Sequence, residues 1–234
     1  MGRIHKIVYK KLMMYYVFMI ILAVDSSHKD LSLSLKVEDK IKTKTYDQDG
    51  KHSGIFLETI NDILEKSNIQ TSNLSGILFN KGPASFTGTR VAASSLQAIG
   101  YSLDIPIIGI SSLEVMAHMH TIDSNMDKFE CAKYAYGDKY FTASFDKAHK
   151  LDQIKDTSLV NIEMINTSHE EHLVINTELS EYLQNNNLRL TSNHTILSRE
   201  TNSEDLISFS EKYINLGSKF NLSDTLPDYA NHEI

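Results

Sequence analysis

A turn rich in glycine and hydroxyl residues, KGPASFTGTR at 81–90, follows the apolar run GILF and precedes a long stretch of small residues. Its glycines, Gly82 and Gly88, can let a ligand approach the backbone closely. Ser85 and Thr87 can cap the helix that follows, whose first N–H groups form an anion site. Residues of these types at this spacing could hold a phosphate.

The same turn lacks the features of a P-loop. Thr89 and Arg90 stand where a P-loop carries Lys and then Ser or Thr, and Pro83 removes one backbone donor. The residues by themselves favour a rigid turn between a strand and a helix over a phosphate site.

A second candidate is Asp25, which ends the apolar run before Ser26 and Ser27. A carboxylate at that point can hold a hydrated metal ion near a nucleotide. The turn after it contains no glycine that would let a phosphate approach the backbone. An aspartate that caps a β-turn explains the pattern equally well.

The histidines and the cysteine predict no metal centre. His118 and His120 are two residues apart, so on a helix they point to different sides. SHEEH, with histidines at 169 and 172, suggests no third ligand nearby, which favours a solvated polar segment. Cys131 is the only cysteine, which excludes an internal disulfide and a cysteine-based zinc site and favours a reducing compartment.

Length and charge narrow the class of protein. The 234 residues can form one large domain or two small ones around a real core. A formal charge of −7 argues against binding nucleic acid through a broad basic surface, because phosphate contacts need clustered Lys and Arg.

The N-terminus allows two interpretations. A basic start and the apolar run 12–24 are typical of a signal peptide. That run is shorter than the roughly 20 residues of a membrane-spanning helix, and VFMIILAV is rich in residues that favour strands. We favour a buried strand, with residues 1–18 as an extension and Met13, Met14 or Met19 as alternative translation starts. An anchored or secreted protein is the other interpretation.

The elements that would position these residues follow from periodicity. Alternation predicts strands at 30–37 and 41–46, and apolar residues on one helical face predict a helix near 53–67. Strands at 76–79 and 105–110 flank a helix of small residues at 86–103, and a further helix begins near 111. The order predicts a mixed α/β domain of about 100 residues.

The second half has weaker signals. CAKYAYGDKYFTASFD predicts a hairpin with its turn at Gly137 and Asp138, and HLVINT predicts a strand. NNNLRLTSNHT and NLSDTLPDY read as loops, so this half is expected to be a smaller α/β domain.

These segments resemble a known family. The stretch from Gly82 to Ala117, GPASFTGTRVAASSLQAIGYSLDIPIIGISSLEVMA, is similar to the signature of the TsaB (YeaZ) family, including Phe86 in its GPGSFTG-like loop. AVDSS resembles the end of that family's first strand, and KHSGIFLETINDILEKSNI its first helix. The resemblance covers about residues 19–117. It implies a degenerate two-domain α/β fold of the actin-like, Hsp70-like (ASKHA) class, with duplicated βββαβα cores of mixed sheets flanked by helices.

The resemblance also implies a function. The family supports synthesis of N6-threonylcarbamoyladenosine in tRNA as a non-catalytic scaffold in the cytoplasm, beside the transferase TsaD, the ATPase TsaE and an upstream TsaC/TsaC2-type synthase. ATP and metal are expected on the partner subunits, tRNA is reached only through the complex, and the isolated chain could form a homodimer. Ser112 and Met116 replace the two metal-binding histidines of TsaD, which argues against a TsaD-like catalytic role.

The implied site residues fall into three groups. The heterodimer interface with TsaD is expected on the first two helices, at Phe56, Ile60, Ile63, Ala92, Ser95, Leu96 and Ile99. The loop motif comprises Gly82, Pro83, Ser85, Phe86, Thr87, Gly88 and Arg90, and Asp25, Ser26 and Ser27 form a vestigial nucleotide site. The expected domains are residues 19–115 and 116–234.

Two departures from the family pattern accompany these expectations. Ala84 replaces a glycine of the signature, and in the second domain only Gly137 and Tyr140 match the usual pattern. The alternative function is a nucleotide-binding phosphotransferase or ATPase of the actin-like fold, which would use Asp25 and the loop from Gly82 to Gly88.

Overall fold

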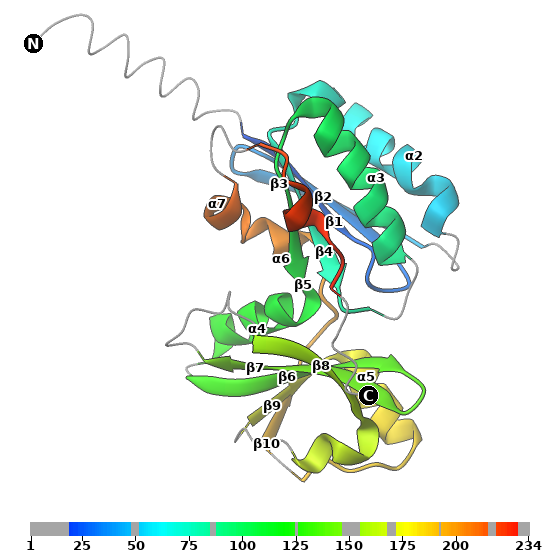
Figure 1. The fold of residues 1–234 in the computed structure, drawn as a ribbon, viewed down its shortest axis with the longest axis vertical. Coiled ribbons are helices and arrows are strands. Elements are labelled where there is room, and N and C mark those ends of the chain that lie inside the picture. Colours follow the sequence, from blue (N-terminus) through cyan, green and yellow to red (C-terminus); the bar gives the residue numbers. More distant parts are fainter. Residues whose placement is uncertain are drawn as a thin grey trace, which may run out of the picture.

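The computed structural model describes residues 19–47, 52–84, 88–124, 126–146, 155–167, 172–191, 193–214 and 219–228. They form two lobes, each built on a five-stranded mixed sheet, with helices packed on the sheets (Figure 1). The predicted extension at residues 1–18 lies outside the described residues. Within the described part of the chain, no helix combines the length and apolar character needed to cross a membrane.

The first sheet has the strand order β3-β2-β1-β4-β5. Its strands are β1 (Ile20–Asp25), β2 (Leu31–Val37), β3 (Lys40–Tyr46), β4 (Gly76–Gly82) and β5 (Ile107–Ser111). β1 pairs antiparallel with β2 and parallel with β4, so it is central and buried along its whole length. The strand predicted from VFMIILAV is confirmed, because a strand covered on both faces reads as a continuous apolar run.

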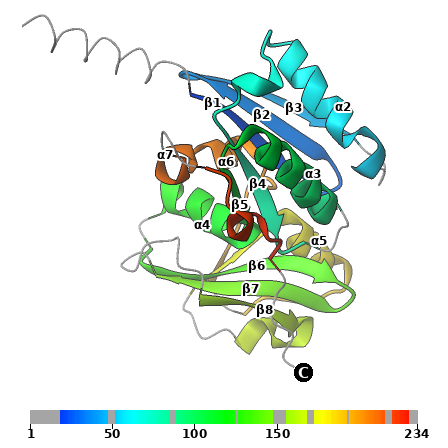
Figure 2. The same ribbon diagram turned by 45° about the horizontal axis from the view of Figure 1, so that its top comes forward.

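Two helices, α2 (His52–Glu65) and α3 (Gly88–Leu103), cover one face of this sheet (Figure 2). The apolar stripes of the two helices pack on the alternating apolar residues of β1 and β2. A short 3-10 helix, η1 (Thr71–Asn73), leads from α2 into β4.

The second sheet repeats this plan with the order β10-β9-β6-β7-β8. Its strands are β6 (Lys128–Tyr136), β7 (Lys139–Asp146), β8 (Lys155–Asn161), β9 (His172–Ile175) and β10 (Asn193–Ile196). The predicted hairpin is confirmed as β6 and β7, with Gly137 at a φ of +58° in the turn. The 3-10 helix η3 (Ile162–Thr167) stands between β8 and β9, and α5 (Thr177–Asn185) between β9 and β10.

Helices after the fifth strand of each half join the lobes. α4 (Ser112–Asp123) contacts strands of both sheets. The chain then returns after β10, and α6 (Ser203–Ile207) packs on β1, β2 and β4 of the first sheet. Two further segments, α7 (Ser210–Tyr213) and η4 (Leu222–Thr225), also lie on the first lobe (Figure 1).

Two features of the second half differ from the sequence prediction. The segment NNNLRLTSNHT is not all loop, because Asn193 and His194 begin β10, which pairs parallel with β9. The expected boundary between residues 115 and 116 falls inside α4, and residues 203–214 pack on the first sheet although they belong to the second half of the sequence. The two lobes therefore do not correspond to two consecutive segments of the chain divided at a single residue.

Candidate functional site

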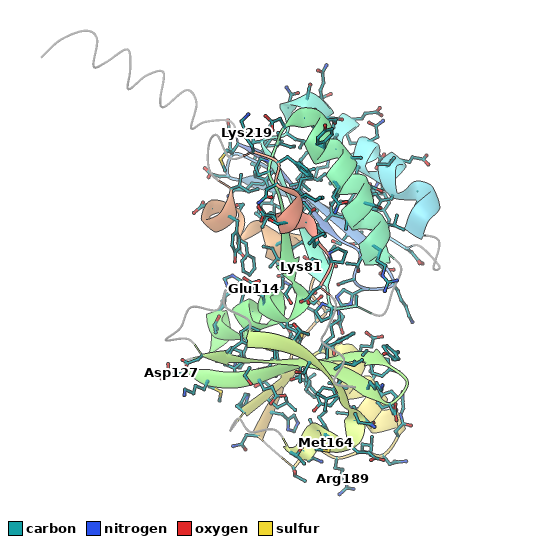
Figure 3. All side chains as sticks on the ribbon, viewed as in Figure 1. Lys81, Glu114, Asp127, Met164, Arg189 and Lys219 are labelled. Carbon is teal, nitrogen blue, oxygen red and sulfur yellow. The ribbon has the colours of Figure 1, made fainter. Side chains whose placement is uncertain are left out.

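A buried polar cluster lies where the two lobes meet, at the ends of β1 and β4, the start of α4 and the middle of β6. We call it the polar junction: Asp25, Ser27, Asn80, Ser112, Lys133 and Thr201. Lys81 and Glu114, labelled in Figure 3, mark this level of the molecule. Segments that are far apart in the sequence meet here, because Lys133 of β6 lies against Ser27 and Ser112.

Asp25 accepts four hydrogen bonds in the polar junction. Its Oδ1 accepts from the backbone N of Ser27 at 2.9 Å and from the Ser27 hydroxyl at 2.7 Å. Its Oδ2 accepts from Asn80 Nδ2 at 3.1 Å and from Thr201 Oγ1 at 3.4 Å. A buried carboxylate needs such donors to offset its lost hydration. The adjacent Ser26 hydroxyl is buried and finds no hydrogen-bond partner in the described part of the chain.

Asn80 and Ser112 connect Asp25 to the following elements. Asn80 Nδ2 also donates to Ser27 Oγ at 3.0 Å, while its Oδ1 accepts from the backbone N of Gly82 at 3.0 Å and from Ser112 Oγ at 2.7 Å. The Asn80 side chain therefore bonds three parts of the chain at once: Asp25 at the end of β1, Gly82 at the start of the loop motif and Ser112 at the start of α4.

Lys133 enters the polar junction from the second lobe. Its ammonium lies 3.5 Å from both Ser27 Oγ and Ser112 Oγ, and the side chain is buried. Burial lowers the pKa of Lys133, while the charges of Asp25, Glu200 and Glu178 oppose that shift.

A second polar group borders the polar junction. Glu200 accepts from Asn176 Nδ2 at 3.0 and 3.1 Å, from the Thr177 hydroxyl, and from the backbone N of Glu178 at 2.9 Å. Burial alone would raise the pKa of Glu200, but attraction to the protonated form of His28 and these hydrogen bonds outweigh burial and lower the pKa. Burial raises the pKa of Glu178.

His28 joins this group to β1. Its Nε2 lies 3.0 Å from Thr201 Oγ1, and its Nδ1 lies 3.6 Å from a Glu200 oxygen. Burial and then the charge of Lys133 lower the pKa of His28, which favours the neutral imidazole.

A cavity of about 390 Å³ opens beside these residues. One lysine, Lys29, and His28 line it together with five carboxylate side chains: Asp25, Asp30, Glu178, Glu181 and Glu200. A cavity of this charge repels phosphate groups and attracts cations. Among the described residues, no cluster of three or more His, Cys, Asp or Glu side chains has the arrangement of a metal site.

The loop motif is only partly described. Gly82 has a φ of +95°, which only glycine adopts readily, and both Gly82 and Pro83 are buried. Gly88 begins α3 and is buried, Arg90 is exposed, and Ser85, Phe86 and Thr87 lie outside the described residues. Whether the loop holds a ligand stays a prediction.

The residues expected at a partner interface lie mostly in the protein's own core. Five of them are covered by the first sheet: Phe56, Ile60, Ile63, Ala92 and Leu96 are each at most 3% exposed. Ser95 is half-buried, and Ile99 is half-buried against the core. The apolar stripe that we assigned to a partner is therefore the stripe that each helix turns toward its own sheet. The exposed side chains of α2 and α3 include Leu57 (59%), Ala98 and Tyr101 (77%).

Sequence reasoning found Asp25, Ser26 and Ser27 but missed Asn80, Lys133 and Glu200. A charged residue in the middle of the strand pattern KFECAKYAY was a usable signal for Lys133. Asn80 and Asn176 each follow a run of apolar strand residues, which was a signal for polar residues near the ends of strands. Nothing in the local pattern of Glu200 marks it as a half-buried hydrogen-bond acceptor.

The two lobes share one plan. In each, strands one to three form an antiparallel meander, and strands four and five run parallel to the first. The first half has the order βββαβα, and the second repeats it with the 3-10 helix η3 in place of the first helix. Two such units with a polar junction between them define a protein of the actin-like fold class, as expected.

Comparison with known proteins then places the chain in a family. A family model described as TsaD, tRNA N6-adenosine threonylcarbamoyltransferase, matches residues 44–186, more than half of the chain. The chain belongs to this family, on its TsaB (YeaZ) branch. TsaB of Buchnera aphidicola from Acyrthosiphon pisum is 36% identical over 98 residues, and TsaB of Bacillus subtilis is 36% identical over 101 residues. YeaZ from Pseudomonas aeruginosa shares the fold with a TM-score of 0.69 at 20% identity, over 90% of this chain and 99% of that one.

The sequence matches are partial. Each of these two TsaB proteins is matched over 44% of its own length, and the matches cover 42% of this chain. The chain therefore aligns with less than half the length of these curated relatives.

Proposed function

We propose that this chain is a non-catalytic scaffold subunit of the complex that makes N6-threonylcarbamoyladenosine in tRNA, and that it pairs with a TsaD-type transferase through the exposed faces of α2 and α3. The observation that carries the proposal is the identity to proteins named as tRNA threonylcarbamoyladenosine biosynthesis protein TsaB. The proposal also includes TsaE as a further partner, a synthase of the TsaC/TsaC2 type that acts upstream, and a cytoplasmic location.

The first turns of α4 support the non-catalytic part of the proposal. Ser112 and Met116 stand where the resemblance places the metal-binding histidines of TsaD. The Ser112 hydroxyl donates to Asn80 Oδ1, and Met116 is fully buried in the second lobe's core. Both positions serve the packing of this chain, and neither side chain is a metal ligand of the imidazole type. We therefore assign ATP and metal to the partner subunits.

The alternative of a nucleotide-dependent phosphotransferase has less support. The cavity beside Asp25 is lined by carboxylates, and the hydrogen bonds of Asp25 come from the chain's own Ser27, Asn80 and Thr201. A nucleotide phosphate beside Asp25 would meet repulsion, and the turn of residues 26–30 has no glycine that would let it approach the backbone.

The exposed faces of α2 and α3 offer a concrete test. Ala98→Arg places a long charged side chain on the exposed face of α3, so we expect TsaD binding to weaken by at least about tenfold while the melting temperature stays unchanged. Affinity is measured by calorimetry with TsaD of the same organism. Asn185→Arg on the exposed end of α5 is the matched control and should bind as the wild type does.

Deletion of the gene and its replacement by the Ala98→Arg variant test the function in the cell. Deleting the gene should lower the content of threonylcarbamoyladenosine in tRNA, measured by mass spectrometry, and Ala98→Arg should not restore it. An unchanged content after deletion, or no complex between the wild-type chain and TsaD, would overturn the proposal.

A further inference from the structure

Each sheet has one charged residue at the same point of its plan, directly after the parallel pairing of its first and fourth strands. In the first sheet the parallel pairing of β1 with β4 ends at Val24 and Phe79, and in the second the pairing of β6 with β9 ends at Ala132 and Ile175. The next residues are Asp25 and Asn80 in the first lobe and Lys133 and Asn176 in the second. Asp25 and Lys133 are thus counterparts in the duplicated plan, and they carry opposite charges.

These counterparts meet in the polar junction. Lys133 Nζ lies 3.5 Å from Ser27 Oγ, and that hydroxyl donates to Asp25 Oδ1 at 2.7 Å. The Lys133 ammonium also lies 3.5 Å from Ser112 Oγ of α4. The two charged residues are 2% and 1% exposed, so neither is compensated by bulk water. The cation of one lobe is therefore linked to the carboxylate of the other through one serine.

The electrostatic energy of two buried charges favours the arrangement of the lobes that keeps them close together. A buried carboxylate or ammonium without a counter-charge is unfavourable, whereas two opposite charges in a medium of low dielectric constant stabilise each other. Separating the lobes would move Lys133 away from Ser27, Ser112 and Asp25 together. Glu200 and Glu178 also attract the ammonium, and His28 lies on the same side of the junction.

We propose that Lys133 is an internal counter-ion for Asp25, and that this pair holds the two lobes in their observed arrangement. The inference is independent of the proposed function, because it concerns the isolated chain. It predicts that the two residues act as a pair across the lobes rather than as separate core residues.

A double-mutant cycle tests the pairing. Asp25→Asn and Lys133→Met should each lower the melting temperature by roughly 5–15 °C, because each leaves one buried charge without its counter-charge across the junction. The double variant should lose clearly less than the sum of the two single losses, because both charges are gone. Lys128→Met, at the exposed end of the same strand, is the matched control and should melt within about 2 °C of the wild type. Additive losses would overturn the proposal.

A distance measurement tests the effect on the lobes. Spin labels on Ser94→Cys in α3 and Asn185→Cys in α5 report the separation of the lobes, and Cys131 is buried and so protected from labelling. We expect one narrow distance distribution in the labelled parent and in Lys128→Met, and a broader or longer one in Lys133→Met. Lys133→Gln provides the same test should Lys133→Met fail to fold. An unchanged distribution in a folded Lys133 variant would show that other contacts hold the lobes and would overturn the proposal.

Discussion

At the scale of single residues, the surroundings of His28 determine the protonation state of its imidazole. Its imidazole lies between Thr201 and Glu200, and Lys133, Asp25 and Asp30 also act on it. Burial is the largest effect, followed by the charge of Lys133, and both disfavour the imidazolium. The neutral ring can accept from or donate to Thr201 without adding charge to the junction.

This leads to a pH prediction. Because the pKa of His28 is lowered in the folded state, the unfolded state binds more protons below the ordinary histidine pKa of about 6.5. The stability associated with His28 is fully present above that pH and is lost as the pH falls toward the folded-state pKa. We expect His28→Gln to reduce the loss of unfolding free energy between pH 7 and pH 5.5, measured by urea denaturation. A steeper loss in the variant would contradict the assignment.

At the scale of elements, α3 owes its position to small residues on its inner face. Gly100 is buried against β5, and a Cβ there would lie 2.5 Å from Ile107 Cγ1 and 3.1 Å from Phe220 Cδ2. The stripe of small residues noted in the sequence thus brings α3 close to its own sheet. The exposed small residues, such as Ser94 and Ala98, lie on the other side of the helix.

A substitution at Gly100 tests this close approach. Helix propensity favours alanine over glycine by up to about 1 kcal/mol, but the Cβ would force Ile107 and the helix apart, at a cost of about 1–3 kcal/mol. We expect Gly100→Ala to lower the free energy of unfolding by roughly 1–2 kcal/mol in urea titrations. Ser102→Ala, exposed on the same helix, should not destabilise the protein.

At the scale of the whole molecule, the second half of the chain completes the first lobe. Residues from α6 and α7 cover the face of the first sheet opposite α2 and α3, where Leu206, Ile207 and Phe209 pack with Ile21, Ala23 and Leu78. Tyr213 also donates from its hydroxyl to Glu114 Oε1 at 2.8 Å, which ties α7 to α4. The first lobe is therefore closed only when residues near 203–214 have folded onto it.

Leu206 provides the corresponding prediction. Leu206 is fully buried, so Leu206→Ala should lower the free energy of unfolding by about 2–5 kcal/mol, although the sheet that it covers begins more than 170 positions earlier in the sequence. Leu222→Ala is the control, because Leu222 is 56% exposed and should change stability by less than about 0.5 kcal/mol. Equal effects of the two changes would contradict the described packing of α6.

The sequence by itself determined the local elements and the family resemblance. Alternation, continuous apolar runs and helical periodicity predicted most strands and helices between Ile20 and Asp123, since burial on one or both faces is reflected in the spacing of apolar residues. Only the tertiary structure decided which surface each apolar stripe contacts, and it turned Phe56, Ile60 and Leu96 toward the chain's own sheet. It also brought Lys133 to Ser27 across 106 positions, because that meeting depends on how two duplicated sheets face each other. Local patterns carry no information about that pairing, whereas the packed lobes determine it.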